Sequence, residues 1–404
     1  MSQNSESSPT RERVGPLFLI VLATITAFLP MALHLFFPAL PSVRTEMMTT
    51  EALVNLTVSV PLFVMAFASL VYGSLSDRYG RRPVLLGSIA LFVLGSVLSA
   101  FADNIWLLIA GRIIQSAGGG GGLGLARTIA KDVFGAARLV KVISYLTMAY
   151  ALGPMISAPV GGALVDWAGW RAVLAAAAIF GAIIGTTCFF IMFETHPNSG
   201  GSRVTLNPLR DFGVLFRNIR FSAYVFQSGC NSAAFFTMAS ASSYLMIDYL
   251  GRPAGEYGLY FICFPLGFLA GSLISSRLAG RIRIETMVFV GSVVMATGAL
   301  TQSGFLFAGI VTPLTIFLPG FFTIIAQGLS LPSAQAGAIN VAGPLAGTAA
   351  GIGVFIQLLA AGLATQIYGV VADGTPLPMA FVVSTFAALA VIVGCIPFAL
   401  RHRE

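Results

Sequence analysis

Long, almost uninterrupted apolar runs recur along the whole chain, and no other feature constrains its fold as strongly. A helix that crosses the hydrocarbon core of a bilayer needs about 20 mostly apolar residues. Twelve such runs are found in the 404-residue sequence, roughly Leu17–Ala39, Leu53–Tyr72, Pro83–Ala102, Trp106–Leu125, Val142–Val165, Val173–Phe193, Ser222–Ile247, Tyr257–Leu278, Met287–Phe307, Thr312–Leu331, Gly347–Val371 and Met379–Leu400. Only 9% of the residues are charged, against about 25% in soluble domains. We therefore predict an all-α membrane protein of twelve transmembrane helices, with the lipid bilayer as its surroundings.

The polar stretch Glu194–Arg220 divides the runs into two sets of six. We predict a cytoplasmic tail at residues 1–16, a six-helix domain at 17–193, a basic cytoplasmic linker at 194–220 and a second six-helix domain at 221–404. Two halves of this kind are common structural repeats in secondary transporters. The first run is longer than the core of a signal peptide, which spans about 7–15 residues, so we expect it to remain as the first membrane helix.

Lysine and arginine are distributed unevenly between alternate loops. With the N-terminus placed in the cytoplasm, 18 of the 22 basic residues fall in cytoplasmic segments, and only Arg44, Arg171 and Arg252 fall in outside loops. Cytoplasmic loops of membrane proteins carry the excess of basic residues, so both termini are predicted to be cytoplasmic. The net charge of +7 then reflects topology, and we expect no nucleic-acid partner.

The segment that follows the second run combines glycines with charges. It reads Gly73-Ser-Leu-Ser-Asp77-Arg78-Tyr-Gly80-Arg81-Arg82, and it resembles the signature loop between helices two and three of the major facilitator superfamily. Gly73 and Gly80 would allow a tight turn. Asp77 would face the N-terminus of the helix that begins near Gly347, where a carboxylate contributes typically 0.3–1 kcal/mol, and would hold the cytoplasmic gate shut. The alternative interpretation is an ordinary solvated turn.

Two further motifs lie inside the predicted spans. Arg112 and Gln115 in the fourth run resemble a second motif of the superfamily. A charge inside a span is costly, so Arg112 is either functional or a clamp on backbone carbonyls of helix one. The fifth run resembles the motif of the antiporters in the superfamily, although Ala158 departs from it, and an ordinary kinked helix is the alternative. Its motif residues are Gly153, Pro154, Pro159, Gly161 and Gly162.

The end of the first run indicates a particular branch. His34-Leu-Phe-Phe-Pro38-Ala-Leu-Pro41 is similar to the bicyclomycin and chloramphenicol branch of the drug:proton antiporters, where an acid usually stands in place of His34. The segments Ala126–Val133 and Gly169–Arg171 also match that branch. The resemblance implies two six-helix domains around a central cavity and a monomer in the bacterial inner membrane. It also implies proton-coupled efflux of small amphipathic compounds, with antibiotics among the candidates and no cofactor or metal.

His34 is the only histidine inside a predicted span, and no acid lies in the middle of one. An unperturbed imidazole titrates near pH ~6.5, so His34 is the predicted proton carrier. Arg112 lies at similar depth by helical rise, so we expect its cation to oppose protonation of His34. Two alternatives remain: His34 only forms hydrogen bonds within the bundle, or the outer carboxylates Asp103 and Asp166 carry the proton.

Several polar and aromatic side chains within the spans either line a substrate cavity or join helices by hydrogen bonds. They are Asn55, Gln115, Gln227, Asn231, Phe235, Phe236, Gln327 and Gln357. The glycines 118–124 include a GxGxxG pattern, but no strand precedes it, so it predicts helix packing rather than nucleotide binding. An uptake symporter on the same fold is the alternative function. An enzyme is not expected, because the spans hold no nucleophile–base pair.

Overall fold

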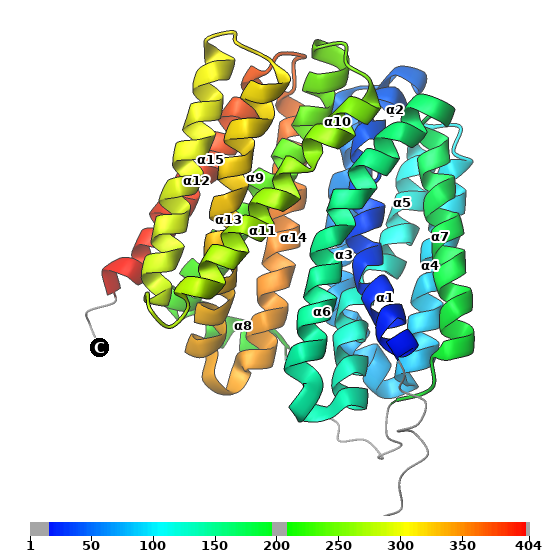
Figure 1. Ribbon diagram of the computed structural model, residues 1–404, viewed down its shortest axis with the longest axis vertical. Helices are drawn as coiled ribbons and strands as arrows, with labels where there is room; N and C mark the ends of the chain where they lie inside the picture. The colour runs from blue at the N-terminus through cyan, green and yellow to red at the C-terminus, as the bar shows by residue number, and fades with distance from the viewer. Residues whose placement is uncertain (1–15, 196–207, 401–404) are drawn as a thin grey trace, which may run out of the picture.

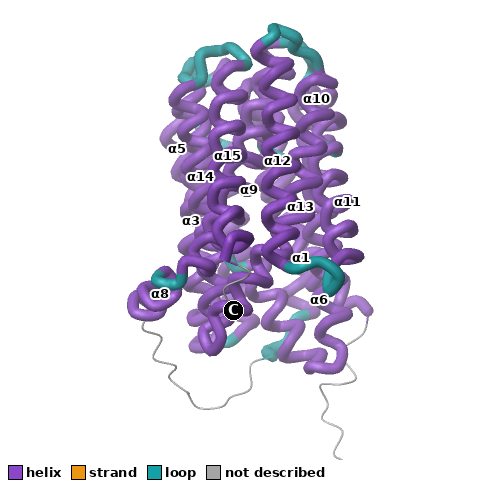
Figure 2. Tube along the Cα trace, turned by 90° about the vertical axis from the view of Figure 1, so that its left-hand side faces the viewer, coloured by secondary structure: helices purple, strands orange, loops and turns teal. Residues whose placement is uncertain are grey.

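A computed structural model describes residues 16–195 and 208–400, and this part of the chain is a bundle of helices (Figure 1). The helices run between two ends, where the connecting loops gather (Figure 2). We name these ends by one residue each. The Asp77 end, at the bottom of Figure 1, carries the turn after the second span, and the Arg44 end, at the top, carries the connection after the first.

The first half contains α1 (Pro16–His34), η1 (Phe37–Ala39), α2 (Leu40–Glu46), α3 (Glu51–Tyr79), α4 (Arg81–Ala100), α5 (Ile105–Gly119), α6 (Gly122–Ala168) and α7 (Trp170–Ile191). The second half contains α9 (Ile219–Tyr244), η2 (Leu245–Tyr249), α10 (Ala254–Phe261), α11 (Cys263–Leu278), α12 (Ile284–Phe307), α13 (Pro313–Ala342), η3 (Gly343–Leu345), α14 (Ala346–Val371) and α15 (Leu377–Ala399). A short helix, α8 (Pro208–Phe216), precedes the second half at the Asp77 end.

Nine helical segments within the described residues are long and apolar enough to cross a membrane. One of them, Pro313–Val371, has 59 residues and contains both α13 and α14. Two further spans fall outside that set: α9 is rich in serine and other polar residues, and α5 has 15 residues and continues into the start of α6. Together these make twelve transmembrane helices, as the apolar runs predict.

The boundaries differ from the prediction in four places. The predicted loop 126–141 is helical and belongs to α6, and α3 and α13 extend beyond the predicted spans toward the Asp77 end. The first span is broken after His34, because Pro38 and Pro41 lack the N–H groups that a continuous helix would use. The tail at 1–15, residues 196–207 of the linker and residues 401–404 lie outside the described residues.

The helices pack mainly within their own half, and two helix pairs join the halves most extensively. These pairs are α3 with α14 and α6 with α10. Glycines permit close approach within each half: a Cβ on Gly118 would lie 2.3 Å from the carbonyl oxygen of Ser88. The close packing predicted for this glycine of the fourth span is therefore confirmed.

Candidate transport site and its gates

His34 is the last residue of α1 and lies buried at the break in the first span, with 4% of its surface exposed. Its ring lies 5.6 Å from the Phe37 ring, and 5.8 and 6.0 Å from those of Phe235 and Phe236 on α9. The Phe261 ring of α10 lies 5.7 Å away. Of the four rings around the imidazole, one therefore belongs to the first half of the protein and three belong to the second. We call His34 and these four phenylalanines the His34 cluster.

The eighth span is kinked at this point. Helix α10 ends at Phe261 and α11 begins at Cys263, and Ile262 between them keeps helical backbone angles, so the two helices form one span. Pro265 accounts for the kink, because it has no N–H to donate to the carbonyl of Phe261 four residues earlier. Discontinuous helices commonly form the binding sites of secondary transporters, because they bring irregular backbone to a cavity. The His34 cluster lies where the first span has such a break.

Arg112 lies nearby in the fold but is held by α3. Its Nε donates to the Thr57 carbonyl at 3.0 Å, one Nη donates to the Gln115 side chain, and its guanidinium lies 4.5 Å from the centre of the Phe36 ring. One prediction for Arg112 is a clamp on backbone carbonyls of helix one. The backbone carbonyl that it contacts instead belongs to Thr57 of α3. Phe36 follows His34 by two residues, so Arg112 contacts the broken part of the first span through an aromatic ring.

The predicted cavity residues fall into two groups. Asn55, Gln115, Gln227 and Asn231 are buried and make hydrogen bonds between helices, to Ser240, Ser96, Ser292 and Ser330 among others. Gln227 Oε1 and Asn231 Oδ1 are nevertheless buried without a partner among the described residues, so these two also remain candidates for substrate contact. Phe235 and Phe236 belong to the His34 cluster. The side chains of Gln327 on α13 and Gln357 on α14 have no hydrogen-bond partner among the described residues, and the amide nitrogen of Gln357 is buried, so these two remain candidates for substrate contact.

The Arg44 end is closed where the fifth and eighth spans meet. The carboxylate of Asp166 accepts hydrogen bonds from the backbone N–H groups of Ala254 and Gly255, at 2.9 and 2.7 Å, and so caps the start of α10. The helix-five motif lies directly below: a Cβ on Gly161 would be 2.2 Å from the Leu35 carbonyl oxygen, and one on Gly162 would be 2.3 Å from that of Ala254. The motif glycines therefore let α6 touch both the broken first span and α10.

This geometry gives a prediction for Gly162→Ala. The added methyl group would clash with backbone atoms of Ala254, which cannot move aside as a side chain could, so α6 and α10 must separate. We expect a smaller population closed at the Arg44 end and slower transport, measured by the distance between spin labels across that end. Gly124→Ala is the matched control, because it lies on the same helix with nothing within 4 Å. Equal behaviour of the two variants would contradict the packing argument.

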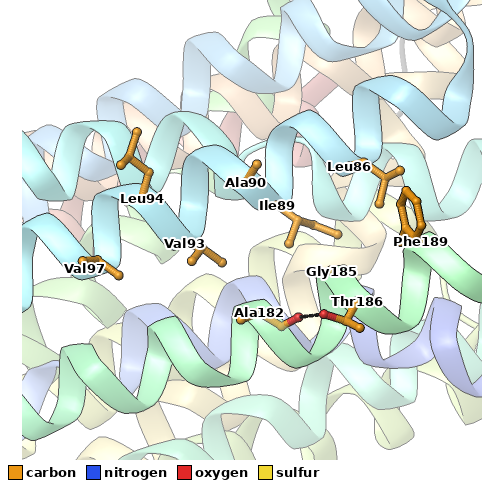
Figure 3. A pocket seen from close by; sticks show the side chains of 11 residues that line it. Leu86, Ile89, Ala90, Val93, Leu94, Val97, Ala182, Gly185, Thr186 and Phe189 are labelled. Carbon is orange, nitrogen blue, oxygen red and sulfur yellow. Dashed lines mark hydrogen bonds between the residues drawn. The ribbon is translucent and has the colours of Figure 1, made fainter.

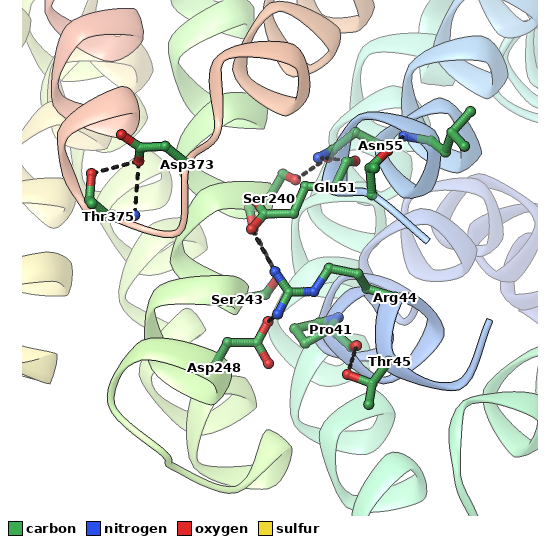
Figure 4. Close-up of polar contacts among 12 residues, drawn as sticks. Pro41, Arg44, Thr45, Glu51, Asn55, Ser240, Ser243, Asp248, Asp373 and Thr375 are labelled. Atoms are coloured by element: carbon green, nitrogen blue, oxygen red, sulfur yellow. Dashed lines mark hydrogen bonds and ion pairs between the residues drawn. The ribbon is translucent and has the colours of Figure 1, made fainter. Parts of the chain in front are cut away.

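Polar contacts between α2, α3 and the end of the seventh span also keep the Arg44 end closed (Figure 4). Arg44 binds Glu51 at 2.8 Å and Asp248 at 2.9 Å. The hydroxyl of Ser240 on α9 donates to Asn55 on α3 at 2.5 Å. On the other side of α3, Gln366 of α14 accepts from the Ser59 hydroxyl and donates to the Ala52 carbonyl. The sequence interpretation did not include Glu51, which lies just before the predicted second span.

At the Asp77 end, the charged motif makes its ion pairs within the first half of the protein. Asp77 pairs with Arg81 at 2.5 Å and its side chain is 62% exposed, and Arg81 also binds Asp132 of α6 at 3.1 Å. In this conformation Asp77 therefore pairs with Arg81, and not with the start of α14 as predicted. Arg82 donates to the Phe189 carbonyl at 2.7 Å, and Arg78 lies over the Tyr79 ring.

The turn of this motif is formed by one glycine rather than two. Gly80 has φ of +93° and ends α3, whereas Gly73 lies inside α3, so the prediction that Gly73 forms the turn is wrong. Helix α3 continues past Gly73 because no proline or cap interrupts it there. A Cβ on Gly80 would lie 2.5 Å from the Glu194 carboxylate, which accepts from the N–H groups of Arg81 and Arg82 at 2.9 and 3.2 Å. Glu194, which the sequence placed in the linker, is thus the acid that caps α4.

The described polar contacts between the halves all lie toward the Arg44 end. At the other end, the contact that continues between α3 and α14 is apolar, with the Phe67 and Phe355 rings 5.1 Å apart. The conformation is therefore one in which polar side chains close the Arg44 end.

A groove of about 610 Å³ lies away from the His34 cluster, between α4 and α7 (Figure 3). Its lining is almost wholly apolar and includes Ile89, Val93 and Phe189. Phe189 and Leu94, another lining residue, are more than half exposed, so the groove opens on the outer surface of the bundle. We assign no transport role to it.

The sequence model of the Major Facilitator Superfamily matches residues 20–365, which include eleven of the twelve spans in whole or in part. The chain belongs to the major facilitator superfamily. As a member of this superfamily it is a multi-pass membrane transporter of small molecules, and not an enzyme. The resemblance to the superfamily that the Gly73–Arg82 segment and Arg112 indicated is confirmed.

Relatives from bacteria extend over most of this transporter. An uncharacterized MFS-type transporter of Bacillus subtilis, YdgK, is 26% identical over 95% of this chain and 96% of its own length. The multidrug resistance protein D of Escherichia coli is 26% identical over 86% of this chain and 87% of its own. A bicyclomycin resistance protein homolog of Haemophilus influenzae is 23% identical over 67% and 69%. The similarity to the bicyclomycin branch, first seen around His34, is thereby confirmed.

Solved structures support the fold. A bacterial homolog of the human lysosomal transporter Spinster, in an inward-facing and occupied conformation, superposes with a TM-score of 0.78. The alignment covers 94% of this transporter and 96% of that chain, at 16% identity. At this identity the likeness concerns the fold alone.

Proposed function

We propose that this transporter exports small amphipathic organic compounds, antibiotics among them, in exchange for protons. The observation that carries the proposal is the His34 cluster, in which a group able to exchange a proton near neutral pH is enclosed by rings from both halves. Aromatic rings offer faces on which a flat apolar compound stacks. Substrate and proton would therefore compete for the same site, the His34 cluster.

The coupling follows from how the cluster is assembled. Phe235, Phe236 and Phe261 belong to the second half and His34 to the first, so a movement of the halves apart at the Arg44 end would separate the imidazole from three of its four rings. Access of His34 to water, and therefore to protons, changes with that movement. Arg112 is held by Thr57 and Phe36 and would add a fixed positive charge near the broken first span.

Export rather than uptake is supported by the helix-five motif and by the names of the bicyclomycin and multidrug resistance relatives. The uneven distribution of basic residues supports cytoplasmic termini in a bacterial inner membrane, so the Asp77 end would face the cytoplasm and the Arg44 end the outside. The contacts of Asp166 and Arg44 would then form the outer gate. We propose that the transporter acts as a monomer with the two domains divided at residues 194–220.

A susceptibility panel tests the proposal. Expression in a bacterium that lacks its major efflux pumps should raise the tolerated concentration of at least one amphipathic antibiotic, and everted vesicles should accumulate that compound when energised. A variant with Gln in place of His34 serves as the matched negative control. If susceptibility is unchanged and whole cells instead accumulate a small metabolite, the uptake symporter is the correct function.

A further inference from the structure

The ion cluster that joins the halves at the Arg44 end contains more negative than positive charge. Arg44 of α2 lies between two carboxylates, Glu51 of α3 at 2.8 Å and Asp248 of η2 at 2.9 Å (Figure 4). Arg44 and Glu51 belong to the first half of the protein and Asp248 to the second. One guanidinium therefore forms ion pairs with two carboxylates, one in each half of the protein.

Burial makes the second negative charge costly. Glu51 is only 9% exposed, and its Oε1 accepts from Arg44 while its Oε2 is buried without a hydrogen-bond partner among the described residues. The hydroxyl of Tyr244, whose ring lies 5.8 Å from the Arg44 guanidinium, is also buried and has no hydrogen-bond partner in the described part of the chain. A buried carboxylate oxygen that accepts no hydrogen bond is unfavourable unless it carries a proton.

The other polar groups around Glu51 do not supply a second cation. The charged or titratable groups that interact with it from each neighbouring element are Arg44 of α2, Tyr244 of α9, Asp248 of η2, Tyr368 of α14 and Asp373 after α14. Arg44 is the one cation in that set. A single bound proton would make the cluster of one arginine and two carboxylates neutral, and two carboxylates at one site share such a proton.

We propose that the Glu51–Asp248 carboxyl pair binds one proton when the Arg44 end closes. This assignment rests on the proposed proton coupling and adds a second protonation site to it, separate from the His34 cluster. Opening of that end would remove Asp248 from Arg44 and let water reach both carboxylates, which then need no proton. Proton uptake and closing are therefore linked, and a proton arriving from outside would favour closing of the outer gate.

The sign of the pH dependence follows from this linkage. The closed state binds the proton more tightly than the open state, so closing is favoured at low pH and is lost as pH rises through the titration of the pair. Linkage to one proton changes the closed-to-open ratio by at most about tenfold per pH unit. Neutralising either carboxylate leaves one cation and one anion, which need no proton, so the dependence should disappear.

The test measures the conformation directly, without substrate or transport. Spin labels at Met48→Cys and Leu314→Cys, two residues that are 93% and 64% exposed, report the distance across the Arg44 end in lipid nanodiscs. The background has the native cysteines Cys188, Cys230, Cys263 and Cys395 replaced. Between pH 5 and 9, the parent protein should shift from closed to open as pH rises, approaching about tenfold per unit.

Glu51→Gln and Asp248→Asn should each stay closed, with a ratio that changes less than about twofold per pH unit. Glu51→Asp keeps a titratable group and should keep the shift. Asp373→Asn is the matched control at the same end: hydrogen bonds from the Thr375 hydroxyl and N–H lower the pKa of the Asp373 carboxyl, so it stays ionised and its loss should leave the shift intact.

A parent protein with no pH shift, or a full shift in both Glu51→Gln and Asp248→Asn, overturns the proposal. A shift caused by sodium at constant pH also overturns it, because the site would then bind a metal cation. None of these outcomes depends on export, so failure of the drug panel and failure of this proton site are distinguished.

Discussion

In everted membrane vesicles, His34→Gln is expected to lower strongly the release of protons that addition of a transported drug causes, leaving only the proton that the Glu51–Asp248 pair gives up when the Arg44 end opens. Glutamine is similar in size and polarity to histidine but cannot exchange a proton, and the four phenylalanine rings of the cluster remain to bind substrate. Drug binding to the purified variant should therefore persist. Proton release is measured with a pH-sensitive dye, and binding by equilibrium dialysis of the labelled drug.

Two companion variants make this result specific. His34→Ala should lower proton release to the same extent. His34→Asp, which restores the acid usual in the bicyclomycin branch, should recover part of the loss with a pH profile shifted downward, because carboxyl groups titrate at lower pH than imidazoles. If His34→Gln releases protons as fully as the parent protein, another group carries them. Asp166 is not expected to be that proton carrier, because its carboxylate accepts hydrogen bonds from two backbone N–H groups at the outer gate.

The sequence predicted the fold well because its strongest signals are local. An apolar run specifies a membrane helix without reference to any distant residue, so the predicted separation of α12 from α13, and the position of α14, agree with the structure. The break after His34 could have been inferred in the same way from Pro38 and Pro41, and the kink in the eighth span from Pro265.

The site was harder to predict because its contacts join residues far apart in the sequence. Phe235 and Phe261 meet His34 only after the halves pack, and a chain with 32 Phe gives no sequence signal to single them out. Asn231 similarly donates to Ser330, a residue about 100 positions away in the sequence, and its cavity role stays a prediction. Glu51 was missed because it lies at the edge of an apolar run, where a charge usually faces water, whereas here a segment of the other half covers it.

Asp77→Asn is expected to reach the membrane normally but to transport more slowly, by up to about fivefold. In this conformation Asp77 is exposed and pairs with Arg81, so it is available to contact another element when the Asp77 end closes. We propose that the element is the start of α14, where a carboxylate contributes about 0.3–1 kcal/mol. A loss of about 1 kcal/mol lowers the population of the closed Asp77 end about fivefold, and export requires that closed state.

Asp132→Asn is the control that separates this proposal from a simpler one. Arg81 binds both Asp77 and Asp132, so either substitution removes one carboxylate from the same guanidinium. Asp132 lies on α6 in the first half, however, so its pairing with Arg81 does not join the two halves. If the contact with α14 matters, Asp77→Asn should slow drug accumulation in everted vesicles much more than Asp132→Asn does. If the two variants slow it equally, Asp77 acts only by positioning Arg81, because the loss of a partner for that arginine would then account for the whole effect.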